Sequence, residues 1–520
     1  MSSSAASLRS GLTIALGRAA RLAARLRGGG SGGTALPGLV MEKTDPGFLR
    51  RTLDQLPLGV VVVSGTNGKT TTTKMVVELL TAQGLKVLTN RTGSNFVRGV
   101  LASLLTEVDA VGRLNHDVAV LELDEAHAVR FVRRVRPRAA LLLNVMRDQL
   151  DRFGEIDYTA SLLHKVAVAT TDAVVVNADD PRLSGPAFFK GVRARTAAFG
   201  AGSGLRSLFV SDDDLRTGSA APAETPDAPA ETPDAPTPAD DAPAADAPAP
   251  VSAPRACPAP RVVLESLQGR GAVVRVDGTD HEVSFAIPGV HNQLNACAAL
   301  ALALEVLGEK ADVDSLLAAL ARVRAAFGRG EVLTLDGRDV ELSLVKNPAG
   351  FRMGLLTAEQ AVAARGAETV MIAINDEYAD GRDMSWLWDV DFTCLRGEGV
   401  AVVTGVRAWD MALRLRYDEV PIGVVEPDLG KALALLRRAP DVVTGAGADK
   451  SAGANAGAGE EAAAADGADK DAGAGAGEDA AAETGTAPSN RPMRVFTTYT
   501  AMLALRARLG ELTEVEEVMK

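Results

Sequence analysis

The residues best suited to chemistry form a glycine-rich loop between a short apolar run and a helical stretch. The loop residues are Gly65, Thr66, Asn67, Gly68, Lys69, Thr70 and Thr71. Glycines let the backbone N–H groups turn inward, the N-terminus of the helix adds partial positive charge, and the lysine adds a full charge. The Thr70 hydroxyl suits Mg²⁺. The loop therefore predicts a site for a nucleoside triphosphate, although Val63 occupies the place of the first glycine in the general motif.

Three acidic residues could complete a Mg²⁺ site beside this loop. Glu122 stands near the end of the apolar run 118–123, and Asp124 and Glu125 follow at once. A Mg²⁺ ion held by one hydroxyl and phosphate oxygens usually recruits a carboxylate. The carboxyl end of a strand is also the edge where open α/β sheets bind ligands. Any of the three could serve, and the alternation of side chains along a strand favours Glu122 or Asp124.

Short apolar runs that alternate with helical stretches indicate the elements that position these residues. Such alternation is typical of βαβ units and parallel sheets. We therefore predict an α/β protein with a basic N-terminal segment, an ATP-binding domain and a second α/β domain, at residues 1–43, 44–330 and 331–520. The runs lie at residues 58–63, 118–123, 139–145 and 173–176 in the first domain, and at 369–374, 400–404, 422–425 and 494–497 in the second.

Two acidic, low-complexity segments interrupt the predicted domains. Residues 221–250 hold seven Asp/Glu, no Lys/Arg and nine of the 25 prolines, and residues 445–490 hold nine Asp/Glu, two lysines and ten glycines. Such segments bury too little apolar surface to offset the entropy of ordering, so we predict disordered insertions at about 212–258 and 445–490. Each segment carries −7 of the net charge of −12, which leaves the rest of the 520-residue chain at +2. The acidic net charge therefore comes from the insertions and gives no information about binding partners. Separately, we predict that the protein does not bind nucleic acid.

The cysteines and the N-terminal segment bear on the compartment. Cys257, Cys297 and Cys394 lie far apart, which favours a reducing compartment over a disulfide framework or a zinc site. No apolar run approaches the roughly 20 residues of a membrane span. Before Glu42 the chain has five arginines and no acid on an Ala/Leu-rich background. This segment predicts either an amphipathic helix on an anionic membrane surface or a helix packed on the next domain. We expect a cytoplasmic protein, or one peripheral to the inner face of the plasma membrane.

Longer motifs resemble a known family. The segments SGTNGKTTT, NVMRDQLDRFGE, NADDP and GVHNQLNACAA are similar, in that order, to the ATP-binding domain of Mur ligases. The segments KNPAGF, INDEYADGRDMSWLWDVDF, TGVRAWDMALRLRY and TTYTAML resemble the MurT family, the synthetase subunit of lipid II isoglutaminyl synthases. The resemblance implies a Mur ligase-like central domain, with a parallel sheet and a P-loop, followed by a Rossmann-like C-terminal domain.

The resemblance also implies a reaction. With Mg²⁺, ATP would phosphorylate the α-carboxylate of D-glutamate in the lipid II stem peptide, and ammonia would displace the phosphate to leave D-isoglutamine. The resemblance implies that a separate GatD-type glutaminase supplies the ammonia, and the lack of a convincing Cys–His pair in this chain fits that dependence. One alternative is a Mur or folylpolyglutamate-type ligase that adds an amino acid to a carboxylate, against which NPAGF and ADGRD argue. Another alternative is a scaffold without catalytic activity that uses ATP to hold a partner at the membrane. The presence of Lys69, Thr70 and Glu122 argues against this alternative.

Several residues match the family's nucleotide and metal positions. Lys69 and Thr70 match the phosphate and Mg²⁺ residues, and Glu122 matches the Mg²⁺ carboxylate. Asn292 matches the asparagine expected to contact the nucleotide. Arg329 stands where the family has an arginine at the end of the central domain, so it would reach the transferred phosphoryl group or form a hinge salt bridge.

One further match concerns the partner subunit. Asp380 corresponds to the aspartate thought to reach across to the glutaminase and complete its Cys–His–Asp triad. Asp383, Asp389 and Asp391 lie in the same stretch, and geometry alone could rank them. Some relatives carry four zinc-ribbon cysteines in the central domain where this chain has Cys257 alone, so we predict no zinc.

Overall fold

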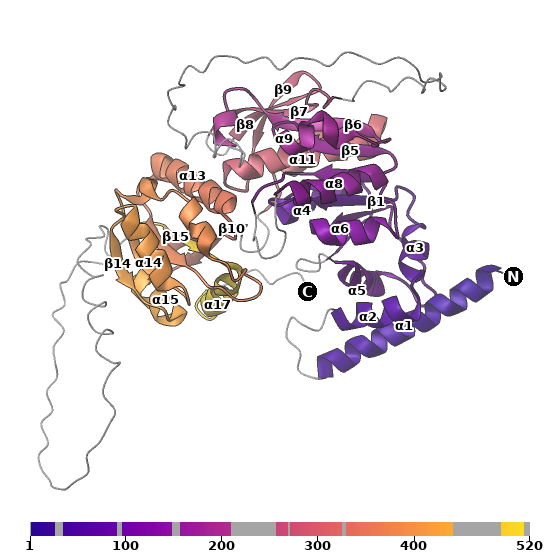
Figure 1. The fold of residues 1–520 in the computed structure, drawn as a ribbon, viewed down its shortest axis with the longest axis horizontal. Helices are drawn as coiled ribbons and strands as arrows, with labels where there is room; N and C mark the ends of the chain where they lie inside the picture. Colours follow the sequence, from indigo (N-terminus) through magenta and orange to yellow (C-terminus); the bar gives the residue numbers. More distant parts are fainter. Residues whose placement is uncertain are drawn as a thin grey trace, which may run out of the picture.

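The computed structural model describes residues 2–26, 35–90, 96–147, 156–209, 256–268, 271–324, 329–439 and 490–513. The two predicted insertions fall almost entirely outside these ranges, as does part of the NVMRDQLDRFGE motif. The described residues form two α/β domains that lie side by side (Figure 1).

A nine-stranded sheet forms the centre of the first domain, in the order β2-β3-β1-β4-β5-β6-β7-β8-β9. Neighbouring strands are parallel from β2 to β7, whereas β7, β8 and β9 pair antiparallel. The central parallel strands β1, β3, β4 and β5 consist mostly of Val, Ala and Leu because helices bury both of their faces. The strands are β1 (Val60–Ser64), β2 (Val87–Thr89), β3 (Val118–Glu122), β4 (Ala139–Leu142), β5 (Ala173–Asn177), β6 (Arg195–Ala201), β7 (Val262–Gln268), β8 (Gly271–Val276) and β9 (Thr279–Ser284).

Helices cover both faces of this sheet and divide the core in two. One face packs against α4 (Lys69–Ala82), α11 (Val290–Leu307) and α12 (Val313–Leu320). The other packs against α3 (Phe48–Leu53), α5 (Val97–Glu107), α6 (Glu125–Val132) and α8 (Ile156–Ala169). The short α9 (Pro181–Ser184) follows β5.

The apolar helix α11 packs against α4, the helix that follows the glycine-rich loop. In the described part of the chain, the stretch Val290–Lys310 alone is long and apolar enough to cross a membrane, and 89% of its most apolar 18 residues is buried. A helix that is apolar all round belongs in a core, and α11 packs on α4 and on strands β4 to β7.

The N-terminal segment forms two helices on the edge of the first domain. They are α1 (Ser2–Leu26) and α2 (Ala35–Thr44), and α1 packs on α2 and α5. Ile14 is buried in this contact, and a Cβ atom on Gly17 would lie 2.9 Å from the side chain of Met41. One side of the helix is therefore packed on the domain, as in one of the two predicted arrangements, and the other side is exposed.

A six-stranded sheet forms the second domain, in the order β10-β11-β15-β12-β13-β14, with the β10–β11 pair antiparallel and the others parallel. The strands are β10 (Arg329–Leu335), β11 (Arg338–Leu344), β12 (Thr369–Ala373), β13 (Val400–Thr404), β14 (Ile422–Val425) and β15 (Met493–Thr497). One face packs on α13 (Pro348–Arg365) and α14 (Ala408–Tyr417), and the other on α15 (Leu429–Arg437) and α17 (Tyr499–Gly510). The expected domain boundary at residues 330 and 331 lies within β10.

Candidate nucleotide and phosphate site

The loop between β1 and α4 has the geometry of a phosphate cradle. Gly65 and Gly68 have φ of +135° and +84°, which L side chains rarely adopt. A Cβ atom on Gly68 would also lie only 2.6 Å from Oδ1 of Asn295 on α11. The Asn67 backbone N–H donates to Oδ1 of Asn144 at 2.8 Å, and Nδ2 of Asn144 donates back to the Asn67 carbonyl at 3.2 Å. The loop is therefore held from outside, and its glycines are required by the backbone and by close packing.

Lys69 is the first residue of α4, and its side chain turns back onto the loop. Its Nζ donates to the Gly65 carbonyl at 2.6 Å and lies 3.3 Å from Asp124 and 3.6 Å from Glu125. Burial opposes ionisation of Asp124, but the charges of Lys69 and Lys346 hold the pKa of this carboxyl below its usual value. Two of the three acids at the end of β3 therefore pair with the lysine.

The third acid, Glu122, faces the threonine of the loop. The Thr70 hydroxyl donates to Glu122 Oε1 at 2.8 Å, and Glu122 is only 4% exposed. Asn90 fixes the strand here, because its side chain donates to the Glu122 carbonyl and accepts from the Glu122 N–H, each at 2.9 Å. The hydroxyl and carboxylate oxygens predicted to hold Mg²⁺ thus lie side by side, and oxygen atoms are the ligands that Mg²⁺ prefers.

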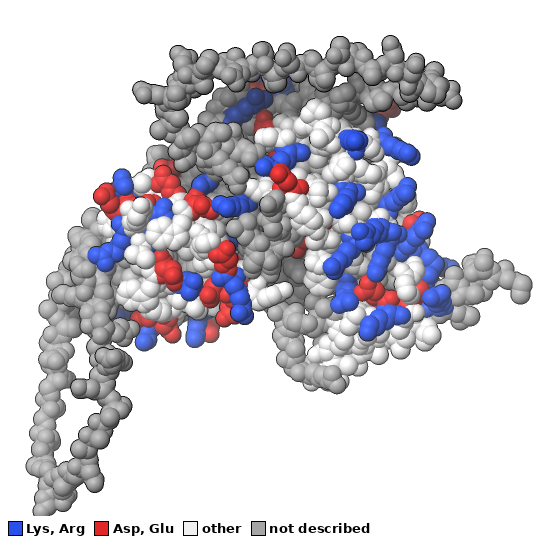
Figure 2. Space-filling model, in the orientation of Figure 1, with Lys and Arg blue, Asp and Glu red and all other residues white. Residues whose placement is uncertain are grey.

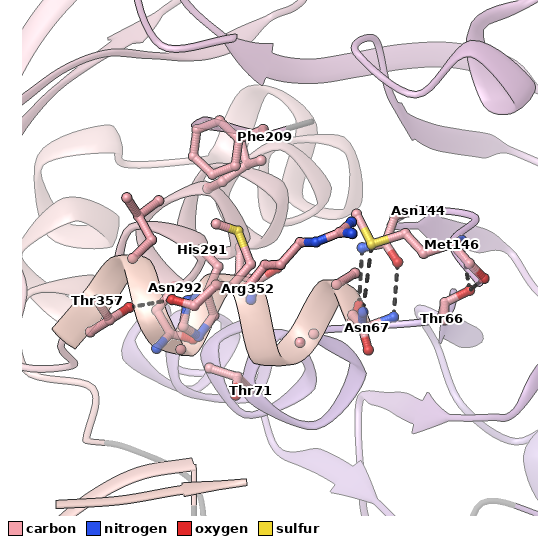
Figure 3. Close-up of a pocket in the computed structure, with 18 of the residues that line it drawn as sticks. Thr66, Asn67, Thr71, Asn144, Met146, Phe209, His291, Asn292, Arg352 and Thr357 are labelled. Atoms are coloured by element: carbon pink, nitrogen blue, oxygen red, sulfur yellow. Dashed lines mark hydrogen bonds between the residues drawn. The ribbon is translucent and has the colours of Figure 1, made fainter. Parts of the chain in front are cut away.

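A cavity of about 460 Å³ extends from this loop between the two domains. Figure 3 shows Thr66, Asn67, Asn144 and Met146 gathered at one end, with Thr71 lower in the same view. His291, Asn292 and Thr357 lie toward the other end. The side chain of Arg352, on α13 of the second domain, extends between them toward Asn67 and Asn144. The cavity therefore has the residues of the glycine-rich loop at one end and His291, Asn292 and Thr357 at the other.

The far end of the cavity offers polar groups to a base. Asn292 is 4% exposed, and its Nδ2 donates to the Pro288 carbonyl at 2.6 Å. The neighbouring His291 is half-buried, and the protein around its ring lowers its pKa to about 4, so the ring is neutral at pH 7. Its Nδ1 has no hydrogen-bond partner among the described residues. A buried polar atom without a partner carries a free-energy penalty, and the edge of a purine could supply the missing bond.

The second domain contacts the phosphate loop through its Lys-Asn-Pro segment. Lys346 Nζ donates to the Thr66 carbonyl at 3.3 Å. The amides of Asn347 and Asn67 exchange two hydrogen bonds, of 3.0 and 3.3 Å. Asn347 also accepts from the Gly350 N–H at 2.8 Å and so caps α13. From the sequence, KNPAGF was identified only as a family motif, and no role was predicted for Lys346, Asn347 or His291.

The remaining predicted residues of the site are placed as follows. Thr71 lies in the first turn of α4 and lines the cavity. Arg329 begins β10, but its side chain lies outside the described residues, and the next residue, Gly330, lines the cavity. In the part of the chain that the structure describes, no three His, Cys, Asp or Glu side chains gather as a metal cluster. The expectation of no zinc stays a prediction.

Asp380 lies away from this cavity and inside the second domain. Its side chain is 1% exposed, its Oδ1 accepts from the Thr500 N–H at 2.7 Å, and its Oδ2 accepts from the Glu377 N–H at 3.1 Å. The carboxylate thus holds the first turn of α17. Asp383, three residues on, is half-buried; its pKa is lowered by hydrogen bonds from Ser385, whose N–H donates at 2.9 Å. The role of Asp380 toward a partner stays a prediction.

Comparisons with known proteins agree with this architecture. A family model of the Mur ligase middle domain matches residues 63–217, and one of the MurT ligase C-terminal domain matches residues 344–442. Solved structures of MurF from Acinetobacter baumannii and of MurF from Thermotoga maritima in complex with ADP superpose with TM-scores of 0.57 and 0.55 at 17% and 15% identity. They cover 91% and 90% of this chain and 81% and 83% of their own. These likenesses confirm the predicted α/β fold of the Mur ligases.

Two curated relatives narrow the family. Both are named lipid II isoglutaminyl synthase (glutamine-hydrolyzing) subunit MurT. The protein of Staphylococcus aureus strain COL is 27% identical over 82% of this chain and 92% of its own length. The protein of Streptococcus pneumoniae strain R6 is 30% identical over 75% of this chain and 83% of its own length. The resemblance drawn from the motifs is thereby confirmed, and this chain belongs to the MurT family of Mur ligase-like proteins.

Proposed function

We propose that this chain is the ligase subunit that amidates the α-carboxylate of D-glutamate in the lipid II stem peptide, in a reaction that uses ATP and Mg²⁺. The observation that carries the proposal is the interdomain cavity, which is lined by Lys69 and Glu122 of one domain and by Lys346 and Arg352 of the other. Glu122 also accepts a hydrogen bond from Thr70. The name shared by the curated relatives supports the choice of reaction.

The loop residues would hold the nucleotide and its metal. Thr70 and Glu122 would coordinate Mg²⁺, and the loop N–H groups with Lys69 would bind phosphate oxygens. Lys69 would exchange its present carbonyl and carboxylate partners for those oxygens. His291 and Asn292 would contact the base. When bound, ATP supplies an electrophilic phosphoryl group, and Mg²⁺ neutralises part of its charge.

Two basic residues of the second domain would stabilise charge where the substrates meet. In the first step a carboxylate oxygen of the substrate bonds to the γ-phosphorus and ADP leaves. In the second, ammonia attacks the acyl carbon, the C–O bond to phosphate breaks, and phosphate leaves. Both steps develop negative charge on oxygen, which fixed cations stabilise in a site that excludes water. Lys346 and Arg352 line the cavity, and Arg329 at the start of β10 remains a candidate for the same role.

A GatD-type glutaminase is the proposed source of ammonia, with the second domain as its contact. The relatives are named as subunits, which implies a partner. An aromatic face is exposed on and beside α14, in which Trp388 stacks edge-on against Tyr417 with ring centroids 5.6 Å apart. Exposed apolar patches of this kind mark protein contacts. Its residues and their exposed fractions are Trp388 49%, Val406 64%, Trp409 42%, Leu413 61% and Tyr417 76%.

Two carboxylates compete for the role in the partner's triad. Asp380 is the residue that the family motif indicates, but its present hydrogen bonds to the start of α17 would have to break. Asp383 already lies at the surface of the same turn with its pKa lowered. If residues 380–383 rearrange on binding the partner, we expect Asp380→Asn to impair glutamine-dependent amidation more than ammonium-dependent amidation. If they do not rearrange, we expect Asp383→Asn to have this selective effect instead. Equal loss with both nitrogen donors in both variants would remove the triad role from this segment.

The reaction itself is tested by mass spectrometry of lipid II after incubation with the chain, ATP and Mg²⁺. We expect amidation with ammonium for the chain alone, and with glutamine only when the glutaminase is present. Lys69→Ala should abolish both activities, because the loop loses its full positive charge, whereas Lys310→Ala, on the surface beyond α11, should not. Absence of amidated product from both wild-type mixtures would refute the proposed function.

A further inference from the structure

The outward face of α1 is apolar from Leu12 to Leu26. Seven exposed residues, spaced so that a helix of 3.6 residues per turn gathers them on one side, carry no charge and no hydrogen-bonding group. Four of them are leucines, with exposed fractions of 64%, 39%, 60% and 80%. The seven residues, called here the leucine face, are Leu12, Ala15, Leu16, Ala19, Leu22, Ala23 and Leu26.

The leucine face is not the side that attaches α1 to the domain. The opposite side carries Thr13 and Ile14, each 2% exposed, and Gly17, which meets Met41 of α2. A helix on the surface of a soluble domain normally turns a polar side to water. Here the side already packed and the side left in solvent are both largely apolar, so the leucine face has the composition of a second contact surface.

Basic residues border this face. Arg9 and Arg18 lie at its two edges; Arg9 pairs with Asp45 at 3.3 Å, and Arg18 donates to the Val108 carbonyl at 3.3 Å. No acidic residue precedes Glu42. Both arginines therefore place positive charge beside the leucines while they also fasten the helix to the domain.

The neighbouring flank of the domain extends the positive charge. Figure 2 shows a dense group of basic side chains above α1, in the area where Figure 1 places α5 and α6. Glu42 of α2 pairs with two of them, Arg98 at 2.8 Å and Arg134 at 2.7 Å, and so offsets only part of their charge. The exposed arginines of this flank, on α3, α5 and α6 and just after α6, are Arg50, Arg98, Arg130, Arg133, Arg134 and Arg136.

We propose that α1 lies on an anionic lipid surface, with the leucine face at the boundary of headgroups and acyl chains and with the bordering arginines against headgroup phosphates. Apolar area and positive charge on one side of a helix are the two features that bind such surfaces. A leucine and alanine face without aromatic or polar groups needs no directional partner, which suits fluid acyl chains. The arginines within α1 keep it on the surface rather than across the bilayer.

This attachment serves the proposed function without depending on it. If the substrate is a membrane-bound lipid, the helix would bring the interdomain cavity to the cytoplasmic surface on which that lipid lies. The binding itself needs neither nucleotide nor substrate. A vesicle experiment therefore tests the helix separately from the reaction.

The test is co-sedimentation of the full-length chain with vesicles of phosphatidylcholine, either pure or with about a third of the lipid replaced by phosphatidylglycerol. We expect binding to the anionic vesicles that weakens as NaCl rises from about 0.05 to 0.5 M. Leu12→Glu with Leu22→Glu should reduce binding by at least about tenfold, since each leucine loses an apolar contact. The matched control replaces two exposed leucines of α15 and α17 in the same way, Leu435→Glu with Leu503→Glu, and should bind as the wild type does.

A second variant separates charge from apolar contact. Arg133→Gln with Arg136→Gln should weaken binding to anionic vesicles and flatten its salt dependence. Equal binding of the Leu12/Leu22 variant and the wild type would overturn the proposal, as would equal binding of the wild type to neutral and anionic vesicles. The proposal also fails if the leucine substitutions abolish self-association or glutaminase binding, measured by light scattering, while vesicle binding is unchanged.

Discussion

Glu122 and Asp124 lie two residues apart at the end of β3 and have different partners. Glu122 reaches the Thr70 hydroxyl, whereas Asp124 and Glu125 face Lys69. From residue chemistry alone, any of the three acids could be the Mg²⁺ ligand. The family resemblance favoured Glu122. The structure supplies the physical reason, because the carboxylate that ends β3 is the one aligned with the first turn of α4.

Asp180 allows a prediction at the residue scale. Burial raises its pKa to about 6, although it accepts from the backbone N–H groups of Val145, Arg182 and Leu183. Because the pKa in the folded state exceeds the ordinary value of 3.8, Asp180 favours folding most below pH 3.8, and that contribution is lost as pH rises through about 6. Relative to Asp180→Asn, the wild type should gain up to about 3 kcal/mol of unfolding free energy between about pH 7 and pH 4.

Urea unfolding of both proteins at several pH values measures this difference. Asp428→Asn is the matched control, because Asp428 also caps a helix and accepts from the Lys431 N–H. That hydrogen bond lowers the pKa of Asp428, so its advantage over asparagine should shrink as pH falls. A difference for Asp180 that shrinks in the same way would contradict the assignment.

At the scale of elements, a buried ion cluster links β15 to the strands on either side of it, β11 and β12. Arg494 is fully buried between β11 and the start of β12, and its guanidinium contacts Glu341 at 2.7 Å and also pairs with Glu368. Arg494→Leu would leave two buried carboxylates with less positive charge beside them, so we expect a loss of about 3–5 kcal/mol in unfolding free energy. Chemical denaturation followed by circular dichroism measures this loss.

The comparison for this prediction is an exposed pair on the same domain. Arg508 lies 3.5 Å from Glu511, and both side chains are more than half exposed. Arg508→Leu should therefore change the unfolding free energy by less than about 1 kcal/mol. Similar losses for the two variants would mean that the buried cluster contributes no more than a surface pair.

At the scale of the whole molecule, contacts between the two domains close the cavity. Besides the Asn67–Asn347 exchange, Arg147 of the first domain pairs with Asp389 of the second at 2.8 Å, with about two fifths of each side chain exposed. An exposed pair is worth at most about 1 kcal/mol, so Arg147→Ala should raise the KM for ATP by up to about fivefold. Steady-state kinetics on the assembled enzyme measures this change.

A charge swap provides the control for that prediction. Arg147→Asp alone should raise the KM further, and adding Asp389→Arg should restore it toward the wild-type value. The midpoint of urea unfolding should stay within error in all three variants, since the pair lies between domains rather than in a core. A KM unaffected by Arg147→Ala would remove this pair from domain closure.

The sequence by itself determined the local elements and the phosphate loop. All eight apolar runs are strands, namely β1, β3, β4, β5, β12, β13, β14 and β15. The predicted Mg²⁺ residues Thr70 and Glu122 lie in contact, because the turn after a buried strand and the strand beside it meet at one sheet edge. Such features are encoded within a few residues by side-chain period and glycine geometry. Strands β2 and β6 to β11 escaped this reasoning, since β2 has only three residues and the others are not the continuous apolar runs that mark a doubly covered strand.

Only the tertiary structure decided which distant groups meet. It placed β15, the last strand in sequence, between β11 and β12, and it set Asn347 against Asn67, 280 residues away. It also buried Asp380 against Thr500, 120 residues on, although the sequence suggested a surface role. It divided α1 into a packed side and a leucine face. Local pattern fixes where a side chain can point, whereas burial and partners depend on which elements pack together, and that is a property of the whole chain.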